Sequence, residues 1–210
     1  MQSLFITATG TNVGKTYTTL QLIKLFADRG LSVGVYKPIE TGVSDIAPDA
    51  SLLLKACQKV NEKFKDFCVE DITAYTFPLP AAPFCADTKH EILLEKIIEK
   101  YHALTKLCDI LLVEGAGGLM VPITKDIMMI DLIMKLGSKV LLVTPSRLGC
   151  INETMLSHEA LRSRHIAFDW CVNLFEDEES FPEVTKPFYD EIFPDWWPID
   201  EGIQRFISSY

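Results

Sequence analysis

The chain has 210 residues, of which 48% are hydrophobic, so it can bury a sizeable core, most simply in one domain over residues 1–210. Its formal net charge of −9 argues against a nucleic-acid partner, because nucleic acid is bound by a basic surface. The six cysteines form no C-x-x-C pair and mostly lie in apolar runs, which indicates buried thiols in a reducing compartment. The first residues lack the basic region of a signal peptide, and charged residues interrupt every long apolar run. We therefore expect a cytoplasmic protein with no membrane partner.

The chain opens with a predicted strand over residues 3–8, which a short loop joins to a predicted helix over residues 15–28. Gly14-Lys15-Thr16 begins that helix. Backbone N–H groups and the helix dipole attract anions at such an N-terminus, so the segment predicts a nucleotide phosphate site. Lys15 would contact the β- and γ-phosphates, and Thr16 would bind Mg²⁺. An ordinary strand-to-helix turn is the alternative, because position 9 holds threonine where a strict G-x-x-x-x-G-K-S/T motif has glycine.

A second predicted strand over residues 32–37 ends in Lys37, and Pro38 follows it directly. A lysine at the carboxyl end of a parallel strand would place a second cation near the phosphates. The alternative is a solvent-facing surface lysine. A helix near residues 49–60 follows, and Asp49 at its start is either a helix N-cap or a further Mg²⁺ ligand.

Prolines within residues 75–88 predict a loop or a broken helix start, and residues 89–107 predict a long amphipathic helix. A strand over residues 109–114 then ends in Glu114, directly before the predicted turn Gly115-Ala116-Gly117-Gly118. An acid at the end of an apolar strand can present its carboxylate to Mg²⁺, and glycines let the backbone approach a ligand. The alternative for Glu114 is a plain N-cap or turn acid.

Predicted helices over residues 127–136 and 151–164 alternate with strands over residues 139–144 and 166–173, and the tail from about residue 175 is less regular. The near-continuous Val, Ile and Leu of the strands are typical of a parallel sheet that is covered on both faces. The sequence therefore predicts an α/β, single-domain P-loop fold with a mostly parallel sheet flanked by helices on both faces. In such sheets ligands bind beyond the carboxyl ends of the strands, where the candidate residues lie.

Four segments together resemble the dethiobiotin synthetase family of the P-loop class. They are Thr11-Asn12-Val13-Gly14-Lys15-Thr16, Lys37-Pro38 through Gly42, Val113-Glu114-Gly115-Ala116-Gly117-Gly118 with Pro122, and Arg147-Leu148-Gly149-Cys150-Ile151-Asn152. The resemblance covers residues 1 to about 173 and is poor in the tail. The chain departs from the family pattern at Ala8, where a glycine is usual, and at Gly10 and Asn12, where acids are common.

The resemblance implies an ATP- and Mg²⁺-dependent ring closure of 7,8-diaminopelargonic acid with CO₂, supplied as bicarbonate, to dethiobiotin, ADP and phosphate. A substrate amine becomes a carbamate, the carbamate oxygen attacks the γ-phosphate, and the second amine closes the cyclic urea. Carbamate and triphosphate are both anions, so Lys15 and Lys37 would be the catalytic cations that hold them together. ATP is the implied co-substrate, Mg²⁺ the cofactor, and a homodimer the implied assembly.

The resemblance also implies roles for individual residues. It assigns Thr16, Asp49 and Glu114 to Mg²⁺, and Thr11, Lys37 and Thr41 to the carbamate end of the substrate. The substrate's tail carboxylate would be received across the homodimer interface by the helix start at Gly149, Cys150, Ile151 and Asn152. The nucleotide-binding residues follow from the phosphate loop and the resemblance together. They are Asn12, Val13, Gly14, Lys15, Thr16, Tyr17 and Asn173.

Two other P-loop functions are alternatives. An amidoligase of the cobyrinate-diamide-synthase type normally carries a glutamine-hydrolysing domain with a nucleophilic cysteine, and 210 residues leave no room for one. A partitioning-type ATPase carries a signature lysine at the position that Gly10 occupies here. Asn173 is the one polar group that the sequence offers the nucleotide base with certainty, so we expect weak discrimination between ATP and GTP.

Overall fold

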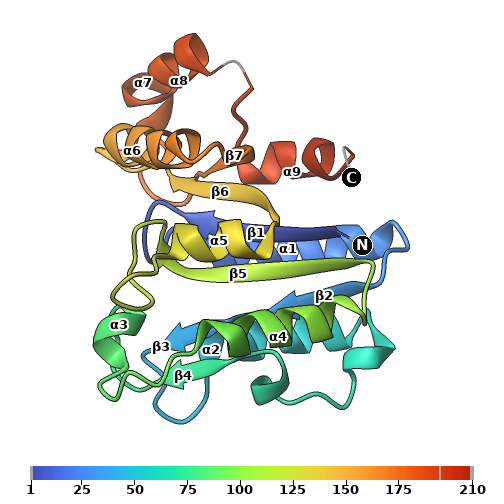
Figure 1. The fold of residues 1–210 in the computed structure, drawn as a ribbon. Helices are drawn as coiled ribbons and strands as arrows, with labels where there is room; N and C mark the ends of the chain where they lie inside the picture. Colours follow the sequence, from blue (N-terminus) through green and yellow to red (C-terminus); the bar gives the residue numbers. More distant parts are fainter. Residues whose placement is uncertain (1, 194, 209–210) are drawn as a thin grey trace.

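A computed structural model describes residues 2–193 and 195–208 of the chain. Its central sheet contains five parallel strands in the order β2-β5-β1-β6-β7 (Figure 1). These strands are β1 (Gln2–Ala8), β2 (Val33–Tyr36), β5 (Ile110–Gly118), β6 (Lys139–Pro145) and β7 (Phe168–Asn173). Their middle residues are almost all buried and apolar, as a sheet with two covered faces requires. The predicted α/β class and parallel sheet are confirmed.

Helices cover both faces of this sheet, as the sequence predicts. On one face α1 (Lys15–Asp28) packs between α2 (Pro48–Gln58) and α9 (Ile199–Ile207). On the other face lie α4 (Leu94–Thr105), α5 (Met129–Leu136) and α6 (Cys150–Ser163). Right-handed crossovers between parallel strands place successive helices in this way. The buried apolar side chains of both faces form one continuous cluster.

A small second sheet extends the fold beyond the carboxyl end of β2. It pairs β3 (Ile39–Thr41) in parallel with β4 (Tyr75–Phe77), and α3 (Pro83–Ala86) follows. Two 3₁₀ turns, Glu62–Phe64 and Val69–Asp71, lie in the connection between α2 and β4. This small sheet holds the residues after Lys37 at the same edge of the main sheet as the predicted phosphate loop.

The residues expected to form a glycine turn after Glu114 instead continue the strand. β5 runs through Gly118, which pairs with Ala8 after a register shift in β1. Side chains would not fit there, because a Cβ on Gly115 would lie 2.8 Å from the Phe5 ring and one on Gly118 would lie 2.9 Å from the Thr9 carbonyl oxygen. The glycines therefore let β5 pass close to β1.

Three other predicted elements differ from the structure. The helix expected over residues 89–107 begins only at Leu94, because the Asp87 carboxylate accepts the N–H groups of Glu91 and Ile92 and folds residues 87–93 into a turn. The helix expected to start at Asp49 starts at Pro48. The segment over residues 75–88 contains β4 and α3 as well as loop.

The tail is more regular than the sequence predicts. After a turn at the acidic residues 176–179 it forms α7 (Phe181–Val184), α8 (Lys186–Ile192) and α9. Aromatic contacts of Trp170 with Tyr189 and Phe193 join α8 to β7, which explains how a segment without clear helical periodicity is held in place.

Four of the six free cysteines are buried, while Cys68 and Cys85 are exposed, so the expectation of buried thiols holds for most of them. Within the described residues no helix has the length and apolar character needed to cross a membrane.

Candidate functional site

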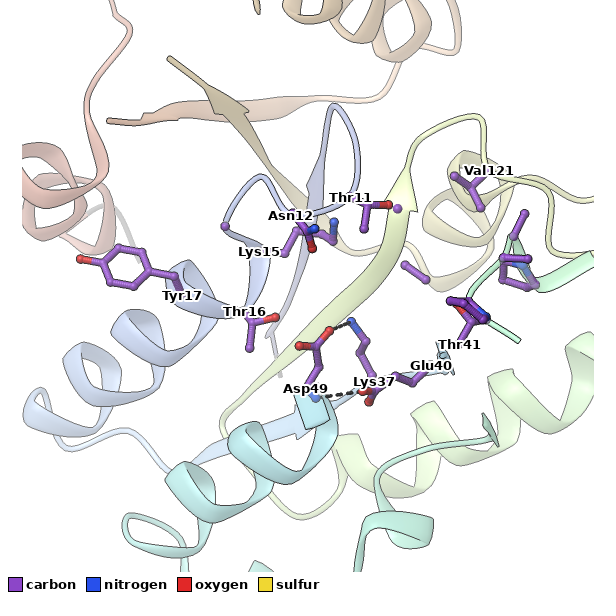
Figure 2. A pocket seen from close by; sticks show the side chains of 17 residues that line it. Thr11, Asn12, Lys15, Thr16, Tyr17, Lys37, Glu40, Thr41, Asp49 and Val121 are labelled. Atoms are coloured by element: carbon purple, nitrogen blue, oxygen red, sulfur yellow. Dashed lines mark hydrogen bonds and ion pairs between the residues drawn. The ribbon is translucent and has the colours of Figure 1, made fainter. Parts of the chain in front are cut away.

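A cavity of about 650 Å³ lies at the carboxyl ends of β1, β2 and β5 (Figure 2). Four chain segments that are distant in sequence meet there: the loop after β1, the residues after β2, the stretch between β4 and α3, and the end of β5. Its lining residues are Thr11, Asn12, Gly14, Lys15, Thr16, Tyr17, Lys37, Glu40, Thr41, Asp49, Pro80, Ala81, Ala82, Pro83, Ala116, Gly117 and Val121.

The loop between β1 and α1 is the segment for which the sequence predicts phosphate binding. Gly14 precedes α1 with a φ of 108°, a conformation that suits glycine, and it leaves the first N–H groups of the helix facing the cavity. Asn173 supports the loop from behind, where its Nδ2 donates to the Val13 carbonyl oxygen at 3.0 Å. A Cβ on Gly14 would lie 2.3 Å from that Nδ2, so no side chain fits at position 14.

Lys15 is buried, and its ammonium group bonds a backbone carbonyl oxygen that a bound anion could replace. Its Nζ donates to the Gly10 carbonyl oxygen at 2.8 Å. Burial, and next the nearby Lys37 ammonium, lower the pKa of Lys15 to about 8. A bound anion would restore the charged form, because an opposite charge nearby favours the ammonium.

Lys37 is buried between two carboxylates, so the surface-lysine alternative is wrong. Its Nζ lies 2.6 Å from Oε1 of Glu114 and 3.1 Å from Oδ2 of Asp49. Burial alone would lower the pKa of Lys37, but Glu114 and Asp49 outweigh burial and raise that pKa. Lys37 is therefore held as an ammonium at the cavity (Figure 2).

Glu114 lies below the cavity, fully buried, and it links β5 to α1. The Thr16 hydroxyl donates to its Oε1 at 2.9 Å, and the Thr19 hydroxyl donates to its Oε2 at 2.9 Å. Neither contact is that of an N-cap or a turn acid, so that alternative is wrong for Glu114. Thr16, Glu114, Lys37 and Asp49 form one connected polar cluster.

The N-cap alternative for Asp49 is also wrong, because Ala47 is the N-cap of α2 and Asp49 is the second residue of the helix. The Asp49 carboxylate points toward Lys37 (Figure 2). No group of three or more His, Cys, Asp or Glu side chains that could hold a metal ion lies within residues 2–193 and 195–208.

Two residues that contact this polar cluster are missed by the sequence analysis. Glu40 accepts the backbone N–H groups of Asp49 and Ala50, and Thr19 donates to Glu114. The signal for Thr19 was its spacing, since it lies three residues after Thr16 on the same helix face. Glu40 gave no signal of its own beyond its place between Lys37 and Thr41.

Tyr17 lines the cavity on the side of the tail. Its hydroxyl donates to Asp200 Oδ1 at 2.6 Å, which ties the first turn of α1 to the first turn of α9. This hydrogen bond, more than burial, raises the pKa of Tyr17. The segment before α9 lies beside β7, where the Val172 N–H donates to the Trp197 carbonyl oxygen. The tail is therefore joined to the first turn of α1 beside the cavity, although none of its described residues lines the cavity.

Some of the predicted binding residues do not line this cavity. Val13 and Asn173 lie behind the phosphate loop, and Gly149, Cys150, Ile151 and Asn152 lie at the start of α6. The Cys150 side chain faces the protein interior, where its sulfur lies 3.5 Å from the Tyr189 hydroxyl. Only the backbone and outer side chains of this helix start can reach a ligand.

The fold has known counterparts among solved structures. The chain is similar to the MinC:MinD cell division protein complex of Aquifex aeolicus, with a TM-score of 0.59 and 15% identity over 98% of this chain and 84% of that chain. It is also similar to a plasmid partition protein from Borrelia burgdorferi, with a TM-score of 0.61 and 10% identity over 100% and 99% of the two chains. At such low identity these likenesses show the fold alone.

Sequence relatives are much closer. The chain is 68% identical to a protein from Sulfurovum sp. (strain NBC37-1) over 100% of both chains, and that protein is named ATP-dependent dethiobiotin synthetase BioD. Proteins with the same name from Wolinella succinogenes and Helicobacter pylori (strain 26695) are 40% and 34% identical, over 91% and 90% of this chain and 89% and 88% of theirs. A family described as an AAA domain matches residues 2–169. The chain therefore belongs to the dethiobiotin synthetase family of P-loop enzymes.

Proposed function

We propose that this chain is an ATP-dependent dethiobiotin synthetase that converts 7,8-diaminopelargonic acid and CO₂ to dethiobiotin, with ATP cleaved to ADP and phosphate. The single observation that carries the proposal is the pair of buried lysines, Lys15 and Lys37, in one cavity at the strand ends of a chain that belongs to this family. The names of the relatives indicate the class of reaction, and the cavity contains two lysines whose charge suits that reaction.

The reaction requires two anions to meet. One substrate amine forms an N–C bond to CO₂ and loses a proton, which gives a carbamate. A carbamate oxygen then attacks the γ-phosphorus while the bond to the bridging oxygen breaks and ADP leaves. The second amine attacks the carbamate carbon, phosphate leaves, and a proton is lost as the ring closes.

Lys15 and Lys37 would lower the repulsion between those anions. Positioning and charge neutralisation are the main contributions of a protein to phosphoryl transfer. Lys15 stands on the phosphate loop, where it would hold the phosphates of ATP. Lys37 comes from the next strand, so we assign it to the attacking carbamate and the γ-phosphate together. Thr11 and Thr41, which line the same cavity, would bind the carbamate end of the substrate.

The donor set beside Lys37 fits Mg²⁺. The hydroxyl of Thr16 and the carboxylates of Asp49 and Glu114 are hard oxygen ligands, and they are linked through Lys37 and Glu114. Mg²⁺ bound there would supply positive charge to the phosphate oxygens. We therefore propose these three residues as its protein ligands.

We further propose that two copies of the chain form the complete substrate site. A second cavity, of about 340 Å³, lies between the phosphate loop and α6, and Thr11 and Val121 line both cavities. Beside it Leu148 and Leu156 are 75% and 63% exposed, which is unusual for leucine. A partner chain on this surface would cover the leucines and bring the α6 start, at Gly149 to Asn152, to the substrate's tail carboxylate.

Product analysis tests the proposed function. The chain should form the cyclic urea from 7,8-diaminopelargonic acid, bicarbonate, ATP and Mg²⁺, with one ADP for each product molecule, and should form none when any of the four is omitted. Lys15→Ala serves as the inactive control. ATP hydrolysis that needs neither the diamine nor bicarbonate would refute the assignment and favour an ATPase of the partitioning type.

A further inference from the structure

Glu40 is a buried carboxylate at the cavity whose two oxygens both bind the start of another element. It lies on β3, three residues after Lys37, and is only 4% exposed. Its Oε1 accepts the Asp49 N–H at 2.8 Å, and its Oε2 accepts the Ala50 N–H at 2.9 Å. Figure 2 shows Glu40 beside Lys37, and a dashed line joins Glu40 to Asp49.

Helix α2 depends on an acceptor from outside the helix. Its N-cap, Ala47, has no polar side chain, and Pro48 at the first helical position has no N–H group. The first N–H to be bonded within the helix is that of Ser51, which donates to the Ala47 carbonyl oxygen at 3.0 Å. The N–H groups of Asp49 and Ala50 would otherwise lack the partner that Glu40 gives them. A negative charge at this end of a helix is also favoured by the helix dipole.

The start of α2 matters because it carries Asp49 to the cavity. The Asp49 side chain is 41% exposed and its carboxylate pairs with Lys37 at 3.1 Å, so side-chain packing does little to fix its carboxylate. Its position is set mainly by the backbone on which it stands. That backbone is held by Glu40, which comes from the same short segment as Lys37.

We propose that Glu40 is a positioning residue, which caps α2 from outside the helix and thereby holds Asp49 at the cavity for Mg²⁺. The inference rests on the proposed function for the role of Asp49 as a metal ligand. Residues that orient metal ligands by hydrogen bonds contribute strongly to metal affinity, although they do not touch the metal.

Equilibrium binding of a fluorescent ATP analogue, titrated with Mg²⁺, tests this role without turnover. Glu40→Gln keeps the shape but turns an NH₂ group toward a backbone N–H. The Mg²⁺ concentration at half-saturation should therefore rise roughly tenfold. Asp49→Asn should raise this Mg²⁺ concentration similarly. The double variant should stay within about twofold of Asp49→Asn alone, because both changes disturb the same contact between Asp49 and Mg²⁺. Hydrogen exchange of the amides at residues 49–51 should become faster in Glu40→Gln.

Asp87→Asn is a matched control. Asp87 is also 4% exposed and also accepts two backbone N–H groups, from Glu91 at 3.0 Å and Ile92 at 2.8 Å, but it does not line the cavity. This variant should lose stability and keep the wild-type Mg²⁺ dependence. If Glu40→Gln does not fold, Glu40→Asp keeps the charge with a shorter reach and should show the same shift.

An unchanged Mg²⁺ requirement in the Glu40 variants would overturn the proposal. A double variant whose Mg²⁺ requirement rises by the product of the two single effects, those of Glu40→Gln and Asp49→Asn, would also overturn it. The binding readout separates this failure from that of the proposed function. A wild-type chain that binds the analogue with Mg²⁺ but forms no dethiobiotin refutes the proposed function and leaves the measurement on Glu40 valid.

Discussion

Lys15 and Lys37 share one cavity but have different hydrogen-bond partners. Lys15 donates to a neutral carbonyl oxygen, whereas Lys37 is paired with the carboxylates of Glu114 and Asp49. The Lys15 ammonium is therefore free to bind the phosphates of a resting nucleotide. Lys37 already has two acidic partners, so its contribution should be greatest when new negative charge develops at the attacking oxygen.

Replacing Lys37 should therefore reduce turnover more than binding. We expect Lys37→Ala and Lys37→Gln to lower the rate of ring closure by roughly 10²- to 10³-fold, which corresponds to about 3–4 kcal/mol in the barrier. ATP affinity should fall much less than in Lys15→Ala. Single-turnover kinetics and equilibrium binding measure the two effects, and Lys65→Ala, at an exposed surface lysine, is the control. Near wild-type turnover in Lys37→Ala would contradict the catalytic role.

His158 is a second buried residue with a predictable response, although it lies away from the cavity. Its ring contacts those of Phe168, Trp170 and Phe193, and neither ring nitrogen has a hydrogen-bond partner within the described residues. Burial, and to a smaller extent Arg162, lowers the pKa of His158 to about 4. The unfolded chain, with a histidine pKa of about 6.5, takes up a proton before the folded protein does.

This difference predicts a loss of stability in mild acid. As the pH falls from about 6.5 toward 4, His158 should lower the free energy of unfolding, by about 1 kcal/mol or more at pH 5. Above pH 6.5 this contribution should be constant. Urea unfolding of the wild type and of His158→Phe at pH 7 and pH 5 measures it, and the variant should lose less stability between these values. Equal losses in both proteins would show that His158 is not the group responsible.

At the level of elements, the sequence predicted those parts of the fold that a local pattern determines. The strands of the main sheet and α1 follow from apolar runs and from Gly14-Lys15-Thr16, and the structure confirms them, whereas phosphate binding by the loop between them stays a prediction. The start of α4 was predicted wrongly because Asp87 competes for the backbone N–H groups of residues 91 and 92. The link between Glu40 and α2 could not be predicted, since it joins residues from different elements through contacts that leave no periodic signal.

The end of β7 and the start of α9 bear on the choice of nucleotide base. At this end of the site one Asn173 Nδ2 hydrogen bond goes to the Val13 carbonyl oxygen, and the Tyr17 hydroxyl donates to Asp200, so these donors are engaged within the chain. Strong discrimination requires polar groups that a wrong base leaves unpaired. We therefore keep the prediction that ATP and GTP bind within roughly tenfold of each other, or about 1.4 kcal/mol.

Competition binding of ATP, GTP and CTP measures this selectivity. Asn173→Ala should weaken all three nucleotides to a similar extent, because Asn173 supports the phosphate loop. A preference for ATP of about a thousandfold or more, lost in Asn173→Ala, would instead show that Asn173 reads the base.

For the whole molecule, the exposed leucines of α6 and of the turn before it predict an assembly. Leu156→Asp should convert a dimer to a monomer, because a carboxylate would be buried in an apolar interface. Ring closure should then be lost while ATP binding stays close to wild type, since the phosphate loop belongs to one chain. Light scattering and product analysis test this, and Leu52→Asp, at an exposed leucine of α2, is the control. A wild-type monomer with full activity would contradict the shared site.

Both ends of the described chain lie at the side of the sheet opposite the cavity. Gln2 begins β1, while Arg29, just after the end of α1, donates to Ser208 and to the Ile207 carbonyl oxygen (Figure 1). A fluorescent label, a fusion partner or a surface anchor attached at either end would therefore stand far from Lys15 and Lys37. Molecules tethered in this way would present the open cavity to solution, which makes the chain suited to binding measurements on a solid support.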